Sequence, residues 1–453
     1  MSKSNFILDR KSLNLNQKVN EQVDLYRGTI CLENKENCYE LTHGEIFLNW
    51  NPIPSFELKG NCLDLDPFKY WVKGTEFDVK IYDQYFSKAK IMDNSNPIRA
   101  TVCFPHLYQI QKVNEYIKKV TFSVVNFSIY NSFRHSELEF KFTLPKEKGK
   151  EKDVEVSISG RQDLTESIQN LKTKGGYCIT HHIQLKFLNV GTVKEVQKVL
   201  RCLILSLRFL KGQDLGFIFI NFLNNDNQII QWNPGIGNIK LYKNCSEVVP
   251  AFEIYNSSGT SIIKRLLDFF TKTEYFNNYS DLIHWYNQAN INSGYTSGSL
   301  ILAQAGVELV WNLYTNRQEY KEANQDQKGE EKTGMKIGEL MRHLSIPNEI
   351  NNETPDLKEY SENYNKDYAK PYCKSEIDSL SHAIAELRNS LVHSNKNKRK
   401  VNIPKYAQFE ARQILLLIIE KYLLDGIGFK GHYNKRPLKL EKVNWDNIIK
   451  FSK

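Results

Sequence analysis

The hydrophobic and polar residues of the first half of the chain alternate with the two-residue period of β-strands. In the segment ELEFKFTL, residues 137–144, apolar and polar side chains take turns, and Thr121–Val124 repeats the pattern. This alternation is typical of a sheet with one face in water. Similar short runs follow one another from Tyr26 to about Lys243, separated by turn residues. Successive strands without helices between them predict an antiparallel sandwich or barrel.

One helix is expected to interrupt this β-rich region, over residues 193–210. Its apolar side chains recur at helical spacing, at Val193, Val196, Leu200, Leu203 and Leu207. Gly212 follows as a stop signal, because glycine adopts the backbone conformation that ends helices more easily than other residues do. Strands are expected again over GFIFINFL, residues 216–223, and NIKLY, residues 238–242. The region should therefore return to β-structure before it ends.

After about Ala251 the hydrophobic period changes to that of α-helices. Helices are expected over residues 261–271, 279–289, 299–314, 335–344, 375–392 and 406–424. The polar segment 350–372 contains Pro355 and Pro371 and is expected to be extended. The sequence thus predicts an α+β multidomain protein, with a flexible tail over residues 1–22, a β-rich domain over 23–250 and an α-helical domain over 251–453.

The net charge and the lengths of the apolar runs indicate which partners and which location to expect for the chain. The formal net charge of its 453 residues is +9, which favours an anionic partner such as nucleic acid, although scattered lysines also serve solubility. The start of the chain lacks the apolar core of a signal peptide. The longest apolar run, Ile414–Ile419, is too short to cross a membrane. We therefore expect a cytoplasmic protein that does not enter the membrane.

The cysteines and histidines do not form a recognisable metal-binding pattern. The eight cysteines include no CxxC pair, so a zinc site is not expected. Cys31, Cys103 and Cys202 lie in apolar runs, where a reduced thiol packs as a small hydrophobic side chain. His181 and His182 are neighbours on an expected strand, so they point to opposite faces and cannot hold one metal ion. No phosphate-binding glycine loop occurs. We expect neither a metal nor a cofactor.

The helix expected over residues 375–392 ends in the residues that carry the candidate chemistry. Its apolar side chains form one stripe, at Leu380, Ile384, Leu387 and Leu391. Arg388 and Asn389 lie beside this stripe, and His393 follows four residues after Asn389. Arg388 and His393 are about 140° apart around an ideal helix. They can converge on one ligand only if the helix ends near His393, or if a second copy of the chain supplies part of the site.

Arg388 and His393 are suited to cleaving RNA without a metal ion. The 2′-hydroxyl of RNA can attack the adjacent phosphate when a group of near-neutral pKa accepts its proton. Histidine titrates in that range, and the arginine fork fits the phosphate oxygens. Asn389 can bind the phosphate or orient the imidazole. A purely structural alternative is that Arg388 and His393 cap helix carbonyls and bind carboxylates.

Three further features are candidates for the same function. A basic cluster follows the motif as a candidate RNA-binding surface, at Lys396, Lys398, Arg399 and Lys400. Glu308, in the apolar segment AGVELVW, is a candidate to pair with Arg388 or to set the charge of His393, or it faces solvent. The segment FKGHYNKRPLKLEKVNW, residues 429–445, is basic with interleaved aromatic residues. It can contact RNA by charge and stacking, or pack over the helices.

The segment Arg388–His393 resembles the R-x4-H motif of HEPN domains, including the polar residue after the arginine. The order of a β-rich part and a helical part resembles the ApeA-like antiphage proteins, over about residues 26–433. The resemblance implies an abortive-infection endoribonuclease that needs no metal or cofactor, with Arg388, Asn389 and His393 in its site. It also implies that two HEPN domains pair in a homodimer or higher homo-oligomer, and that transfer RNA is the substrate.

Two other functions stay open from the sequence. The first is a non-catalytic HEPN adaptor that binds RNA or a partner protein through the same groove. The second is a carbohydrate-binding β-sandwich, which needs an exposed aromatic platform from Trp50, Trp71 or Trp232. In the ribonuclease interpretation, the β-rich domain senses a phage-derived trigger, holds the nuclease inactive or builds the oligomer.

Overall fold

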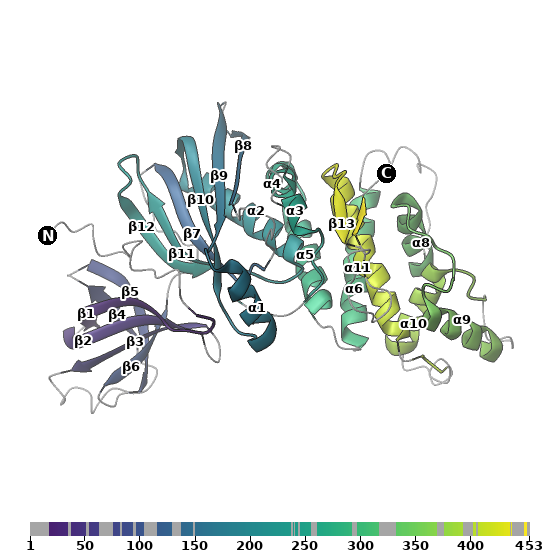
Figure 1. Cartoon of the computed structure of the whole chain (residues 1–453), viewed down its shortest axis with the longest axis horizontal. Coiled ribbons are helices and arrows are strands. Elements are labelled where there is room, and N and C mark those ends of the chain that lie inside the picture. Colours follow the sequence, from purple (N-terminus) through teal and green to yellow (C-terminus); the bar gives the residue numbers. More distant parts are fainter. Residues whose placement is uncertain are drawn as a thin grey trace. The chain divides into compact units, whose positions relative to one another are not determined.

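The chain forms two compact units in a computed structural model (Figure 1). The first unit comprises Met1–Arg201 and Leu215–Tyr242, and the second comprises Cys202–Asp214 and Lys243–Lys453. The structure describes residues 18–34, 38–50, 54–62, 76–81, 84–93, 97–103, 116–128, 137–147, 150–236, 239, 241–242, 245–254, 261–291, 297–316, 332–368, 376–392, 402–404, 406–434, 436 and 448–450. The α+β fold class expected from the sequence is confirmed, with antiparallel β-structure first and a helical region after it.

The first part of the first unit is a closed antiparallel barrel with the strand order β1-β2-β3-β6-β5-β4. Its strands are β1 (Val23–Glu33), β2 (Cys38–Asn49), β3 (Ser55–Cys62), β4 (Glu76–Ile81), β5 (Gln84–Asp93) and β6 (Ile98–Cys103). Pairing of β1 with β4 closes the barrel. The apolar residues of the alternating pattern fill its interior, among them Ile30, Leu41, Leu58, Val79 and Ala100. Closure removes the unpaired strand edges that an open sheet leaves.

The second part of the first unit is a six-stranded antiparallel sheet with the order β12-β11-β7-β10-β9-β8. Its strands are β7 (Ile117–Val125), β8 (Glu137–Glu147), β9 (Lys150–Gly160), β10 (Ile179–Gly191), β11 (Gly216–Leu223) and β12 (Ile229–Ile236). The strand expected over residues 238–242 is not formed by its described residues. Tyr242 instead donates its backbone N–H to the carbonyl of Gly176, because this segment leaves the sheet.

Two helices lie between strands of this sheet along the chain, where only one was expected. Helix α2 (Val193–Lys211) confirms the predicted one and ends before Gly212, whose φ is 70°. Helix α1 (Leu164–Lys174) was missed. Its buried Leu164, Ile168 and Leu171 do recur at helical spacing, but the pattern spans barely two turns and most of the other residues are polar.

Trp50 does not form an exposed aromatic platform. Its side chain is 1% exposed and stacks on Tyr177 with 5.6 Å between ring centroids. The indole N–H donates to the backbone carbonyl of Glu21 at 2.8 Å. Trp71 and the side chain of Trp232 lie outside the described residues. Trp50 is therefore part of the core of the first unit and offers no exposed ring to a sugar.

The second unit is helical apart from two short strands. Its elements are α3 (Ala251–Ile254), α4 (Ile262–Lys272), α5 (Phe276–Ile291), α6 (Ser297–Thr315), α8 (Thr333–His343), α9 (Pro355–Tyr368), α10 (Leu380–Val392), α11 (Ala407–Gly426), β13 (His432–Asn434) and β14 (Ile448–Lys450). Helix α11 packs against α6, α5 and α9 (Figure 1). A Cβ on Gly306 of α6 would lie 2.7 Å from Cδ1 of Ile419 on α11, so the two helices approach each other closely at this glycine.

Helix α9 corrects the extended structure expected over residues 350–372. Pro355 occupies its first position, where a missing N–H costs nothing. Leu357, Tyr360 and Tyr364 are buried one turn apart. The periodicity was missed because two of these three positions are tyrosines in a polar segment. The carboxylate of Glu410 on α11 also accepts from the backbone N–H of Leu357 at 2.8 Å, which satisfies an end of α9 that only tertiary structure brings within reach.

Two observations bear on the other general expectations. None of the described helices combines the length and the apolar character that a membrane span requires.

Cys31, expected to be a reduced thiol, is disulfide-bonded, whereas Cys202 is a free, buried thiol as expected. The side chain of Cys103 lies outside the described residues.

Candidate functional site

Helix α10 carries the predicted motif on a well-packed support. Leu380, Ile384 and Leu387, three members of the predicted apolar stripe, are at most 4% exposed. The helix packs against α8, α9 and α6 within the helical unit (Figure 1). A buried stripe of this kind fixes the rotation of the helix about its axis, and so fixes where its polar side chains lie.

Arg388 lies half-buried in the last described turns of α10. Its Nη1 donates to Oδ1 of Asn389 at 3.4 Å, and its Nε is buried without a partner. Within the described residues, no carboxylate forms an ion pair with this guanidinium. A partly buried arginine is usually neutralised by an acidic group, and the described part of the chain supplies none to Arg388.

Asn389 is held by a short chain of polar contacts. Its Nδ2 donates to Oε1 of Glu386 at 3.3 Å. The other carboxylate oxygen of Glu386 accepts from the phenol of Tyr364 on α9 at 3.2 Å. The amide of Asn389 is thereby oriented with its nitrogen toward Glu386 and its oxygen toward Arg388. Sequence reasoning did not find Glu386 or Tyr364. The spacing of three residues between Glu386 and Asn389 was a usable signal, but Tyr364 lies on another helix.

The remaining part of the motif lies outside the described residues. The description of α10 reaches Val392, so His393 lies outside the described residues. The same holds for the basic cluster that follows, at Lys396, Lys398, Arg399 and Lys400. The catalytic assignment of His393 and the RNA-binding assignment of the cluster therefore stay predictions.

Glu308 lies exposed on α6 and accepts a hydrogen bond from Nε2 of Gln304 at 3.3 Å. The described contacts of Glu308 and of Arg388 do not include each other. A direct ion pair between these two residues is therefore not present. An influence of Glu308 on the charge of His393 stays a prediction.

A groove of about 1270 Å³ runs between α8 and α10 and reaches Asn389 and Glu386. Residues of α10 at helical spacing line one side of it, at His382, Ala385, Glu386 and Asn389. Lys332, Met335 and Glu339 line the opposite side along α8. The amide of the motif therefore faces a cavity large enough for a ligand, since small-molecule pockets usually measure roughly 300–1,000 Å³.

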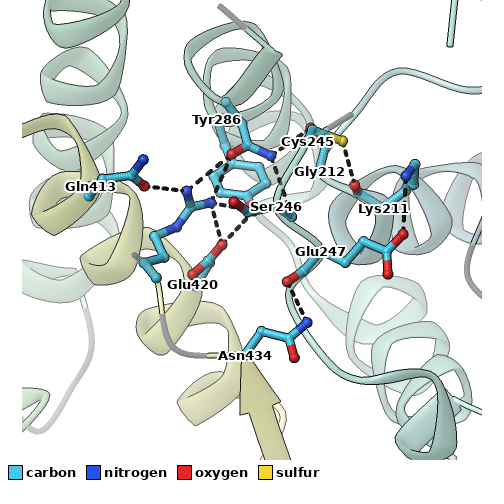
Figure 2. A network of polar contacts seen from close by, with 11 residues as sticks. Lys211, Gly212, Cys245, Ser246, Glu247, Tyr286, Gln413, Glu420 and Asn434 are labelled. Atoms are coloured by element: carbon cyan, nitrogen blue, oxygen red, sulfur yellow. Dashed lines mark hydrogen bonds and ion pairs between the residues drawn. The ribbon is translucent and has the colours of Figure 1, made fainter. Parts of the chain in front are cut away.

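The basic C-terminal segment packs into the helical unit where it is described. Arg436 is 3% exposed, and its guanidinium donates to Glu420 at 2.5 Å and to Gln413 at 2.8 Å, both on α11. It also reaches Tyr286 and Asn290 of α5 (Figure 2). The alternative of packing over the helices is thus the correct one for Arg436, which is not available to RNA.

The described residues hold no candidate metal-binding site. Within the ranges that the structure describes, no group of three or more His, Cys, Asp and Glu side chains is placed to hold a metal ion.

Comparisons with known proteins match both units. Residues 112–238, which contain the six-stranded sheet, match the family model of the YopA central domain. Residues 272–446, which contain most of the helical unit, match the family model of the YopA C-terminal domain. No curated protein and no solved structure matches the chain. The chain is thus similar to YopA in the parts that hold the sheet and the motif-bearing helix.

Proposed function

We propose that the helical unit is a metal-independent endoribonuclease whose site contains Arg388, Asn389 and His393. One observation carries the proposal: a half-buried arginine on α10 has no carboxylate partner in the described part of the chain. An arginine held in this way loses hydration without gaining an ion pair inside the protein. Binding of an RNA phosphate restores the missing interactions, and the planar fork of arginine fits two phosphate oxygens.

In the proposed reaction, the imidazole of His393 accepts the proton of an RNA 2′-hydroxyl, and that oxygen attacks the adjacent phosphorus. Arg388 stabilises the charge that develops on the non-bridging oxygens. The bond from phosphorus to the 5′-oxygen breaks, and a protonated imidazole supplies the proton to that oxygen. The products are a 2′,3′-cyclic phosphate and a 5′-hydroxyl.

The wider proposal concerns the setting of this reaction. A second copy of the chain contributes residues to the catalytic site, in a homodimer or higher homo-oligomer, because Arg388 and His393 are about 140° apart on an ideal helix. We place the protein in the cytoplasm, where transfer RNA is a substrate and a phage-derived trigger is the activating signal of abortive infection. The β-rich unit is proposed to restrain the nuclease until that signal arrives.

The test replaces one histidine. His393→Ala removes the proton acceptor, so cleavage of total RNA in the presence of EDTA is expected to fall by about 10²–10⁴-fold. Gel analysis of the RNA, with end-group mapping of the products, measures this. His284→Ala is the matched control, because His284 is exposed on α5 and outside the motif. The unfolding midpoint of both variants should equal that of the wild type.

Two results contradict the proposal. The catalytic assignment is wrong if His393→Ala cuts RNA at the wild-type rate. Retention of intact RNA by the wild-type chain, with no cleavage under any condition tested, would instead identify a non-catalytic adaptor that binds RNA through the same residues.

A further inference from the structure

The groove between α8 and α10 ends beside the residues of the proposed nuclease site. A Cβ placed on Gly334 would lie 3.5 Å from Cα of His382, and one on Gly338 would lie 3.0 Å from Oγ of Ser381. Later residues of α8 thus lie against earlier residues of α10, so the two helices run antiparallel. The start of α8 therefore lies toward the end of α10 that carries Asn389, which lines the same groove.

The two ends of the groove differ in chemistry. At the start of α8, Lys332 is exposed, and Met335 is 63% exposed with a large apolar side chain. Farther along α8 the lining holds Glu339, which is paired with Arg342, together with Glu376 and Asp378. A further carboxylate of the lining, Glu386, lies beside Asn389. An exposed apolar surface close to a cation suits a flat ring joined to a phosphate. Carboxylates accept hydrogen bonds from amino and imino groups.

We propose that this groove binds one nucleotide of an RNA strand, next to the phosphate that Arg388 holds. The base packs on Met335 and presents its amino and imino groups to the carboxylates, and the backbone phosphate lies at Lys332. This inference rests on the proposed function, since it places the neighbouring nucleotide of the same RNA strand. Guanine is the preferred base, because its Watson–Crick edge offers adjacent imino and amino donors that match the two oxygens of one carboxylate.

The experiment measures binding without cleavage. A fluorescent RNA oligonucleotide with 2′-O-methyl groups lacks the attacking hydroxyl, so its fluorescence anisotropy with the full chain reports affinity alone. Lys332→Glu and Met335→Glu are each expected to weaken binding about tenfold. Lys336→Glu is the control for charge, because Lys336 lies on α8 but does not line the groove. Met92→Glu is the control for an exposed methionine. Both controls should bind like the wild type.

Base preference gives an independent readout. Wild-type protein is expected to bind a guanine-containing oligonucleotide about tenfold more tightly than one with uracil at the same positions, and Met335→Glu should reduce this ratio. Unchanged affinity in both groove variants overturns the proposal. So does binding of an arginine-rich peptide in place of RNA that depends on Lys332 and Met335.

Failure of the groove and failure of the nuclease are distinguishable. If the wild-type chain cleaves RNA and the groove variants cleave it with an unchanged KM, the groove inference is wrong and the nuclease stands. If the chain never cleaves RNA but the groove variants lose affinity for the oligonucleotide, the groove stands and the nuclease is wrong.

Discussion

At the scale of single residues, Arg436 and Arg388 have opposite surroundings. Arg436 is buried against the carboxylate of Glu420, and both side chains are 2% exposed. Burial alone lowers the pKa of the Arg436 guanidinium, but Glu420 and Tyr286 more than offset it, so this pKa is raised. Burial and the charge of Glu420 raise the pKa of Tyr286 well above its ordinary value. The phenol therefore stays protonated and donates to Glu420 at 2.6 Å.

Removing the Arg436 charge should be strongly destabilising. Arg436→Met leaves the buried carboxylate of Glu420 without its cation, which costs about 3–5 kcal/mol of the free energy of unfolding. Urea denaturation of the full chain measures this. Arg388→Met is the matched control and should change the free energy of unfolding by less than about 1 kcal/mol, because Arg388 has no carboxylate partner in the described structure.

A double variant separates the lost ion pair from lost packing. Arg436→Met with Glu420→Leu should recover most of the stability, since no buried charge remains. If Arg436→Met alone unfolds at the wild-type urea concentration, the network in Figure 2 does not stabilise the unit.

At the scale of elements, the strength of the periodic signal decided which ones could be predicted. Helices α6, α10 and α11 carry long apolar patterns, and all three were expected within a few residues of their observed bounds. Helices α1 and α9 present only short, largely polar patterns, and both were missed. Their stability depends on neighbours that the local sequence does not reveal, such as Glu410 at the start of α9.

Strand β10 shows how alternation separates two adjacent histidines. His181 is 0% exposed, and His182 is half-buried on the other face, where its Nδ1 lies 2.9 Å from Oγ of Ser123. The expectation that they point to opposite faces is confirmed. Burial, with a smaller effect of the neighbouring His182, lowers the pKa of His181 from 6.5 to about 3. His181 is therefore neutral in the folded protein.

The buried histidine predicts a pH-dependent stability. Below pH 6.5 the unfolded chain binds a proton at His181 that the folded chain binds only near pH 3. This contribution is fully present above pH 6.5 and is lost as the pH falls toward 3, by about 2 kcal/mol between pH 7 and pH 5. Urea denaturation at pH 7 and at pH 5 measures the free energy of unfolding. Between these pH values His181→Phe should lose about 2 kcal/mol less of this free energy than the wild type does. The control variant His284→Phe should lose as much as the wild type. Equal losses in the wild type and His181→Phe would contradict the prediction.

At the scale of the whole molecule, the proposed site calls for two copies of the chain. Arg388→Ala and His393→Ala are each expected to be inactive. After the two variants are unfolded together and refolded, about half of the dimers contain one chain of each kind. If Arg388 of one copy works with His393 of the other, every mixed dimer has one complete site. The mixture should then recover about a quarter of the wild-type activity.

The mixing experiment has a clear opposite outcome. A site built within one chain gives no activity in the mixture, because each chain lacks one essential residue. Analytical ultracentrifugation of the wild type, over the concentrations of the assay, establishes that the chains associate.

The sequence by itself determined the order of β-rich and helical parts, the faces of the main helices and the spacing of Arg388, Asn389 and His393. These follow from local periodicity, because the geometry of strands and helices relates near neighbours in the chain. Only the tertiary structure decided that Tyr364 supports Glu386, that a groove lies between α8 and α10, and that Arg436 is buried. The Arg436 contact to Tyr286 joins residues 150 positions apart, and no local pattern encodes such a distance. Burial against Glu420 makes Arg436 a structural residue of the helical unit, whereas Arg388 of the same unit is half-buried beside Asn389.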